Sequence, residues 1–549
     1  MRGRSVDIPG AGDVPALLRR AATARQAGRL AEAEQLCRTA LAAAPDHPDA
    51  QFLLAGVADA AGRPAVAVDL LRRAIVRSPE RAEFHGNLGA VLGRLGRLDE
   101  AIDCFRRAIA LAPAAAAGHL ALGNALQAKG DLDGAVAAFR AAAAAQPRHA
   151  AAHINLGNAL KAAARLEEAE ASLRDAVRLD SDLPEAQHNL GIVLFMQGRL
   201  AEAEIALRAA LRLRPESQLT FRQLALVLIA ADRLDEAARF LIEPVRAQRQ
   251  LGAAPGDAPT FRRANRIKLR HDADQLAYLA TRGQGPDDAA ALVADCEQLL
   301  ARSATDDSFD MAASSPRLAA AYNRLLHLRD TPAEPAGALS RAWDGAAVER
   351  DYRAHPPGYA WFDGLLTPAA LQALWQFCTD STVWFQTTFK NEISATLFNG
   401  FCCPLLLQIA QELRERLPGL LGAQPLSLAW AYKYCGPFSG LGPHADDGAV
   451  AVNFWITPDA ANEDPARGGL VVWDRLVPKH YLRRDRPAQE AIIRSLIEEP
   501  GVAAITVPYR CNRAVVFDGM ILHSTDAFRF KDGYENRRIN ITLLYGHTD

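Results

Sequence analysis

Along the first half of the chain, apolar and small residues recur with a fixed period of 34 residues. When units are counted from residues 14, 48, 82, 116, 150, 184 and 218, the twentieth position is alanine in every unit: Ala33, Ala67, Ala101, Ala135, Ala169, Ala203 and Ala237. From the second unit onward, leucine and a small residue share the seventh and eighth positions, as in Leu88-Gly89, and a proline such as Pro79 closes most units. Small residues let two helices approach closely, and proline ends the second helix. The pattern predicts seven helical hairpins, stacked as a solenoid over residues 14–251.

These units resemble the tetratricopeptide repeat, down to inter-helix turns such as GRLDEAI at 96–102. In that family the sixth position of each first helix faces the concave surface, and here it is asparagine in three units: Asn87, Asn155 and Asn189. An amide side chain can donate and accept a hydrogen bond at once, which suits an extended polypeptide of any sequence. The row is similar to the asparagine ladder of O-linked N-acetylglucosamine transferases, so the concave face is expected to bind a protein or peptide. In the alternative interpretation, these asparagines bridge neighbouring repeats or face water.

After the repeats, the period is lost, and the Gly-Pro-Ala mixture LGAAPGDAPT marks the end of the array. Helical periodicity returns at 261–283, and we expect these helices to cap the solenoid. A loop at 330–339 precedes the last domain. The predicted organisation is a tail at 1–13, the repeats at 14–251, a helical cap and linker at 252–344, and a final domain at 345–549.

In the final domain, short runs of β-branched and aromatic residues replace the helical periods. The candidate strands are 428–434, 449–457, 469–474, 502–509, 513–524 and 537–546. Helical segments such as PAALQALWQFC precede them. Many short strands after helices predict a double-stranded β-helix, or jelly-roll, with flanking helices. The whole chain is therefore predicted to be multidomain, with an all-α solenoid followed by a jelly-roll domain.

Within this domain, the segment GPHADDG places His444 and Asp446 two residues apart. On a strand, this spacing puts both side chains on one face. His523 follows 79 residues later, at the end of an apolar run, and the last predicted strand carries Arg538. Two imidazoles and one carboxylate bind one face of iron(II) and leave other positions open. A guanidinium such as that of Arg538 can grip a carboxylate through two charge-assisted hydrogen bonds.

This order of residues resembles the 2-oxoglutarate-dependent, iron(II)-dependent oxygenases, a superfamily that includes prolyl hydroxylases and AlkB-like enzymes, over residues 345–549. The resemblance implies iron(II) as cofactor, 2-oxoglutarate and dioxygen as cosubstrates, and ascorbate as reductant. It assigns the iron and the catalysis to His444, Asp446 and His523, and cosubstrate binding to Arg538, Tyr434, Asn453 and Asn540. Arg537 is the rival anchor for the far carboxylate, and Asp447 the rival metal ligand.

Composition limits the choice of partner. Lys+Arg 62 against Asp+Glu 64 gives a net charge of -2, which provides no field for gathering nucleic acid or anionic lipid. No apolar run approaches the length of a membrane span, so a cytoplasmic protein without membrane contact is expected. The eight cysteines include no CxxC pair, which argues against a zinc ribbon. Nothing in the sequence indicates the oligomeric state.

The favoured function is hydroxylation of a protein side chain, prolyl first, presented by the repeats. One alternative is oxidation of a small metabolite or of a glycan or lipid precursor, with the repeats recruiting a partner. Another is a catalytically inactive interaction scaffold. The basic insertion between 474 and 502 is either a lid over the site or a solvated helix.

Overall fold

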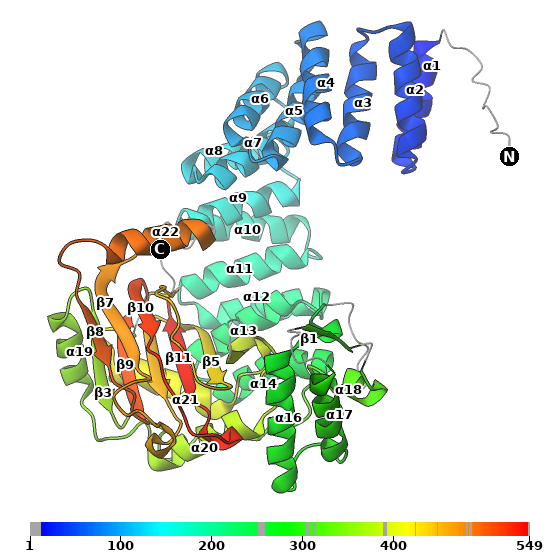
Figure 1. The fold of residues 1–549 in the computed structure, drawn as a ribbon. Coiled ribbons are helices and arrows are strands. Elements are labelled where there is room, and N and C mark those ends of the chain that lie inside the picture. The colour runs from blue at the N-terminus through cyan, green and yellow to red at the C-terminus, as the bar shows by residue number, and fades with distance from the viewer. Residues whose placement is uncertain are drawn as a thin grey trace. The chain divides into compact units, whose positions relative to one another are not determined.

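The computed structural model describes residues 13–250, 259–302, 308–311, 314–387, 392–422, 424–446, 448–478, 481 and 486–546. The chain divides into two compact units, Met1–Glu216 and Ser217–Asp549, which we describe separately. Among the described residues, no helix is both long enough and apolar enough to cross a membrane. Figure 1 shows the elements of both units.

The first unit consists of paired antiparallel helices. Its helices are α1 (Val14–Gln26), α2 (Leu30–Ala43), α3 (Pro48–Ala60), α4 (Pro64–Arg77), α5 (Ala82–Arg94), α6 (Leu98–Leu111), α7 (Ala116–Lys129), α8 (Leu132–Ala145), α9 (Ala150–Ala162), α10 (Leu166–Leu179), α11 (Pro184–Met196) and α12 (Leu200–Leu213). The first helix of every pair begins at the residue from which the sequence repeat was counted. The six repeats of this unit form the predicted all-helical solenoid.

Small residues hold the two helices of each pair close together. The alanines at the twentieth position are fully buried, including Ala67 and Ala101. A Cβ atom on Gly89 would lie 2.7 Å from the Phe105 ring, and one on Gly123 would lie 2.6 Å from the Phe139 ring. The recurring Leu-Gly step is therefore a consequence of helix packing, because only glycine leaves room for the ring of the second helix.

The turn between the two helices of each pair needs a left-handed backbone. Gly130 supplies it in the fourth unit with φ of 90°, whereas the fifth unit places Ala164 at the corresponding position with φ of 57°. A non-glycine residue pays a steric cost in this region. The backbone of the turn at Ala164 is therefore more strained than that of the turn at Gly130.

Replacing Ala164 with glycine is expected to stabilise the repeat unit by roughly 0.5–1 kcal/mol, because the relief of strain exceeds the entropy cost of glycine. The measurement is the urea midpoint of the helical circular dichroism signal. Ala163→Gly is the matched control, since Ala163 has φ of −85° and glycine there should destabilise. Equal midpoints for the two variants would contradict the assignment of strain to Ala164.

The second unit begins with the seventh helix pair, α13 (Gln218–Ala230) and α14 (Leu234–Arg249). The segments that follow are α15 (Pro259–Arg262), β1 (Arg263–Asn265), α16 (Arg266–Thr281), α17 (Ala289–Ala301), β2 (Ser308–Asp310) and α18 (Pro316–Ala321). Helix α16, which we expected to cap the repeats, packs against α20 (Pro368–Asp380), β4 (Glu392–Thr396) and η5 (Tyr534–Asn536). The Gln275 side chain donates to the carbonyls of Thr379 and Ser381 at 3.1 and 2.9 Å, which fixes α16 to α20.

Two antiparallel sheets make up the rest of the second unit. The larger has the order β3-β9-β6-β11-β5-β4 and the smaller the order β10-β7-β8. Besides β4, the strands are β3 (Tyr359–Asp363), β5 (Leu426–Tyr434), β6 (Val450–Trp455), β7 (Leu470–Leu476), β8 (Ala504–Val507), β9 (Arg513–Asp518), β10 (Ile521–Thr525) and β11 (Ile539–Tyr545). The accompanying helices are α19 (Gly345–Ala354), η2 (Leu397–Asn399), α21 (Pro404–Arg416), η3 (Asp459–Ala461) and α22 (Arg486–Ile497).

Apolar residues of both sheets pack into one core, which includes Trp455, Val472, Val507 and Phe517. Strands β6 and β11 are buried along their whole length, so both of their faces are covered. On one face, the Tyr545 hydroxyl donates to the carbonyl of Ala410 in α21 at 2.9 Å. The opposite face of the large sheet turns toward the small sheet.

One predicted strand is wrong. The run 513–524 forms two strands, β9 in the large sheet and β10 in the small sheet. Between them, a Cβ atom on Gly519 would lie 1.9 Å from the carbonyl oxygen of Gly448, and the Met520 amide donates to the Asp518 side chain. The close approach of two backbones sets this turn, and the Asp518-Gly519 step inside the run is the sequence signal that could have indicated it. Strands β3 and β4 were also not predicted.

Candidate metal centre

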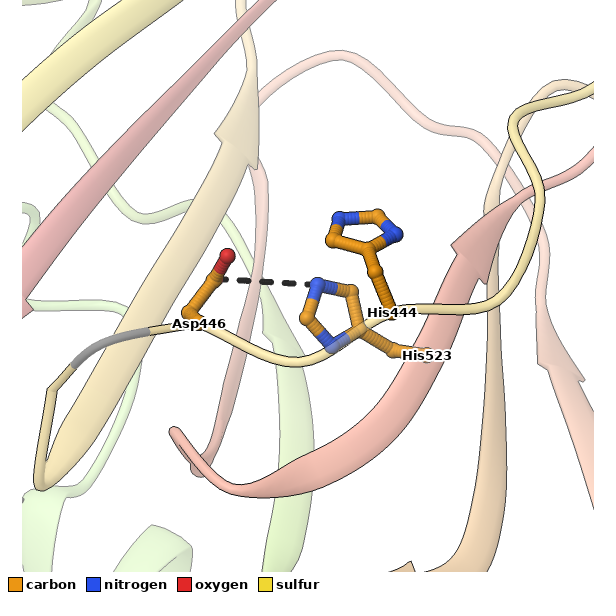
Figure 2. Close-up of side chains that lie close together, drawn as sticks. All are labelled: His444, Asp446 and His523. Atoms are coloured by element: carbon orange, nitrogen blue, oxygen red, sulfur yellow. Dashed lines mark ion pairs between the residues drawn. The ribbon is translucent and has the colours of Figure 1, made fainter. Parts of the chain in front are cut away.

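The site forms where the segment after β5 meets β10. We predicted that His444 lies on a regular strand, and this is wrong. His444 instead forms an isolated β-bridge with His523. The amide of each histidine donates to the carbonyl of the other at 2.9 Å, and the Asp446 amide donates to the carbonyl of Gly519 at 2.9 Å. The turn at Gly519 and the bridge together position the backbone of these segments. The side chains of His444, Asp446 and His523 lie close together there, as Figure 2 shows.

The donor atoms of His444, Asp446 and His523 all lie within 4.8 Å of one another. No other group of at least three His, Cys, Asp or Glu side chains meets this criterion in the part of the chain that the structure describes. The Asp446 Oδ2 atom is 3.6 Å from the His523 Nε2 atom. Asp447, the rival ligand, lies outside the described residues.

Backbone carbonyls orient both imidazoles. The Nδ1 atom of His444 lies 3.0 Å from the carbonyl oxygen of Gly442, and that of His523 lies 3.0 Å from the carbonyl oxygen of Ile521. A carbonyl only accepts hydrogen bonds, so Nδ1 carries the proton in each ring and Nε2 keeps its lone pair. Metal-binding histidines have the same arrangement, in which the second nitrogen is fixed by a hydrogen bond.

Burial shifts all three groups toward their uncharged forms. It raises the pKa of the Asp446 carboxyl to about 7 and lowers the pKa of His444. Burial and the neighbouring His444 lower the pKa of His523 well below its ordinary value. A divalent cation would favour the ionised carboxylate and the neutral imidazoles together, so this donor set fits iron(II).

A buried cation lies in the same unit. Arg538 is 1% exposed, and it donates from Nε to the carbonyl of Gly468 at 2.9 Å and from Nη1 to Asn540 Oδ1 at 3.1 Å. Its guanidinium carbon lies 4.8 Å from the centre of the Phe528 ring and 5.1 Å from that of Tyr434. Burial lowers the pKa of Arg538. Among the described residues it has no carboxylate ion-pair partner, which leaves its charge available to an anionic ligand.

The neighbouring candidates differ in their partners, although Arg537 and Arg538 line one pocket. Arg537, the rival of Arg538, forms an ion pair with Asp274 of α16. Asn453 is 7% exposed and donates to the Thr542 hydroxyl at 2.9 Å, while its side-chain oxygen has no hydrogen-bond partner. Tyr434 and Asn540 contact Arg538, and Asn453 contacts Thr542, two residues after Asn540 on β11. An orphaned acceptor such as the Asn453 oxygen is the kind of group that a ligand or water satisfies.

Aromatic side chains gather around Tyr434 and Arg538, and one of them, Phe438, also lines the cleft at His444. Phe438 packs on Tyr434 at 4.9 Å between ring centres, and Phe528 lies 4.9 Å from Tyr434. Trp455 and Tyr509 complete the surroundings of the Arg538 guanidinium. Of these aromatic residues, the sequence pointed only to Tyr434. The others were missed, because they come from separate strands and loops and share no spacing.

A cleft of about 1210 Å³ reaches one of the metal donors, His444. Residues 437–444 line one side, and Tyr481 and α22 line the other. The apolar face of α22 packs on Ala445 and Leu522, the neighbours of two metal donors. The basic insertion therefore contains a helix that borders the site. Its residues Arg483 and Arg484 lie outside the described residues.

The three repeat asparagines have different surroundings. Asn87 is exposed, and its amide donates to the Glu83 carbonyl of its own helix at 2.8 Å. Asn155 is half-buried. Asn189 accepts from the Lys161 ammonium of the preceding repeat at 3.5 Å, which corresponds to the bridging alternative.

Comparison with known proteins identifies the repeats. A tetratricopeptide repeat model matches residues 24–90, and a model of the cilia and flagella-associated protein 70 C-terminal domain matches residues 76–292. The N-terminal part of the chain is a tetratricopeptide repeat array. No curated protein matches the chain.

Similar solved structures cover the repeats in part. They include MamA, with 24% identity over 29% of this chain and 94% of that chain (TM-score 0.28). YrrB, described as a tetratricopeptide protein with an unusual peptide-binding site, has 23% identity over 32% of this chain and 90% of that chain (TM-score 0.29). PilF of Pseudomonas aeruginosa has 18% identity over 38% of this chain and 96% of that chain (TM-score 0.34).

Proposed function

We propose that residues 345–549 are a 2-oxoglutarate- and iron(II)-dependent dioxygenase that hydroxylates a polypeptide side chain, with prolyl as first choice. The observation that carries this proposal is the metal donor set itself. His444, Asp446 and His523 converge within 4.8 Å, with both Nδ1 atoms held by backbone carbonyls. The buried Arg538 in the same unit adds a partner for the far carboxylate of 2-oxoglutarate.

In this proposal, the two sheets are the halves of a double-stranded β-helix. Strand order supports it, because successive segments alternate between the sheets except at the β7–β8 pair, which stays in the small sheet. Strands β5, β6, β9 and β11 belong to the large sheet, while β7, β8 and β10 belong to the small sheet. The His444 segment lies between β5 and β6 in sequence and bridges to β10. Such alternation is the connectivity of a jelly-roll.

Each residue has a defined task in the proposed enzyme. His444, Asp446 and His523 hold iron(II), which when bound supplies the activation of dioxygen. The Arg538 guanidinium binds the far carboxylate of 2-oxoglutarate through a forked, charge-assisted contact. Tyr434 excludes water around this contact, and the unpartnered Asn453 oxygen orients the cosubstrate through a hydrogen bond.

The cleft supports a polypeptide substrate over a small metabolite. Its volume of about 1210 Å³ exceeds the range of roughly 300–1,000 Å³ that small-molecule pockets occupy. We further propose that the concave face of the repeats binds the substrate protein or a partner, with the exposed Asn87 as one contact. An inactive scaffold is less consistent with a complete donor set and a buried arginine.

Anaerobic titration of the full-length protein tests this function. Iron(II) followed by 2-oxoglutarate is expected to produce the visible charge-transfer band of a metal-chelated 2-oxo acid. Succinate is the matched control, because it has the carboxylates without the keto group and should produce no band. Iron(II) that binds without a band on addition of 2-oxoglutarate would remove this cosubstrate from the proposal.

A further inference from the structure

Helix α22 carries a row of charges whose sign alternates. Arg486, Glu490, Arg494 and Glu498 follow one another at intervals of four residues, and all four line the cleft that reaches His444. The Glu498 amide donates to the Arg494 carbonyl at 3.1 Å, so the helical geometry extends to the last member. We call these four residues the α22 row.

The apolar side chains of α22 fix the helix in place, and two of them, Ile493 and Ile497, also line the cleft beside the α22 row. Ile492, Ile493, Leu496 and Ile497 pack on the cluster of Ala445, Val477, Tyr481 and Leu522. Ala445 lies between two metal donors and Leu522 precedes the third, so α22 is anchored on the backbone that forms the metal centre. The charged face is exposed along the cleft, where it is available to a bound molecule.

The spacing of the α22 row matches an extended polypeptide. Residues four apart on a helix are separated by about 6 Å along its axis. Alternate residues of an extended chain, whose side chains share one face, are separated by roughly 6.6 Å. Long arginine and glutamate side chains absorb the small mismatch over the length of the row. Each charge of the row can therefore face every second residue of a strand laid along α22.

The alternation of sign selects the class of ligand. A nucleic acid presents phosphates of one sign at every step, and half of the α22 row would repel it. A polypeptide can present acidic and basic side chains in turn. The pairing of Arg486 with Glu490 at 3.2 Å is exposed, with side chains 77% and 61% accessible, so its separation costs little when a ligand binds.

We infer that α22 is the specificity-determining wall of the cleft, and that its row selects an extended polypeptide with acidic and basic residues alternating at every second position. This inference rests on the proposed function, because it names the substrate class of the same site. It makes Arg494 and Glu490, at the centre of the row, the residues that discriminate between substrates.

The test uses the full-length protein and two fluorescent peptides of identical composition, each with a central proline. In the alternating peptide, Asp, Lys, Asp and Lys occupy every second position; in the block peptide, both Asp residues precede both Lys residues. Fluorescence anisotropy at low salt, without iron, is expected to show about fivefold tighter binding of the alternating peptide. High salt should remove the difference, because the contacts are exposed.

Variants assign the preference to the α22 row. Arg494→Glu should abolish the preference, and a peptide with one Asp changed to Lys should recover it on this variant. Glu490→Lys should also abolish the preference, and a peptide with one Lys changed to Asp should recover it on this variant. Ser495→Glu is the control, because it introduces the same carboxylate side chain at an exposed position of α22 that does not line the cleft.

Equal binding of the two peptides by the wild-type protein would overturn the inference, as would an equal loss in Arg494→Glu and Ser495→Glu. Displacement of the alternating peptide by single-stranded RNA would overturn the choice of polypeptide. Because binding is measured without iron, its outcome is independent of the charge-transfer band. A band without peptide preference removes the inference alone, and a preference without a band supports the row and removes the oxygenase.

Discussion

Replacing His523 with alanine is expected to abolish iron(II) retention and 2-oxoglutarate turnover. The variant keeps two of the three donors, and loss of even a residue that only orients a metal ligand weakens affinity by about 10- to 100-fold. We therefore expect iron(II) affinity to fall by roughly 100-fold or more. The measurements are metal content after gel filtration and succinate release from 2-oxoglutarate. Because His523 is buried, with 4% of its surface exposed, its removal can disturb packing. Circular dichroism should therefore be used to confirm that the variant folds.

His355→Ala is the matched control for this change, because it removes a half-buried imidazole that follows α19 and lies outside the metal donor set. It should retain iron(II) and turnover. His444→Ala provides a second test, since His444 is less buried than His523 and its removal disturbs packing less. Turnover that persists in both His523→Ala and His444→Ala would exclude the assigned ligands.

Replacing Arg538 with methionine is expected to raise the 2-oxoglutarate concentration needed for half-maximal turnover by about 100-fold. Truncation of one partner of a buried charge pair costs roughly 2–5 kcal/mol, and a change of about 100-fold in concentration lies within that range of free energies. Methionine occupies a similar apolar volume among the Phe528 and Tyr434 rings. Iron(II) binding should be unchanged, because Arg538 is not among the metal donors.

Thermal unfolding supplies an independent measurement for the same variant. Added 2-oxoglutarate should raise the unfolding temperature of the wild-type protein and leave that of Arg538→Met unchanged. Arg537→Met is the matched control. It loses the ion pair with Asp274 and should keep the wild-type response to 2-oxoglutarate. A loss of response in Arg537→Met, with a normal response in Arg538→Met, would transfer the anchor to Arg537.

The sequence alone predicted the repeats down to single residues. The first helix of each pair begins at residue 14, 48, 82, 116, 150, 184 or 218, as the period requires. This success has a local cause, because each hairpin depends on contacts within one or two neighbouring units. The Leu-Gly step, the buried alanine and the closing proline act within one period and leave their mark in the sequence.

The second unit was predicted less completely because its decisive contacts join distant segments. The run 513–524 was predicted as one strand although it contains the turn-forming Asp518-Gly519 step, and the approach of Gly519 to Gly448 divides it between two sheets. Similarly, the His444 segment is held by a bridge to His523, 79 residues away, in place of the regular strand that its spacing predicted.

What the sequence by itself determined is the repeat register and the identity of the clustered donors, His444, Asp446 and His523. Tertiary structure alone decided which arginine has a carboxylate partner: Arg538 is buried among aromatic rings, while its neighbour Arg537 forms an ion pair with Asp274 of α16. It also decided that α22 borders the cleft. The surroundings of the two arginines and the position of α22 have the same physical reason. Residue types and short spacings define what a side chain can do, but long-range packing defines which groups surround it.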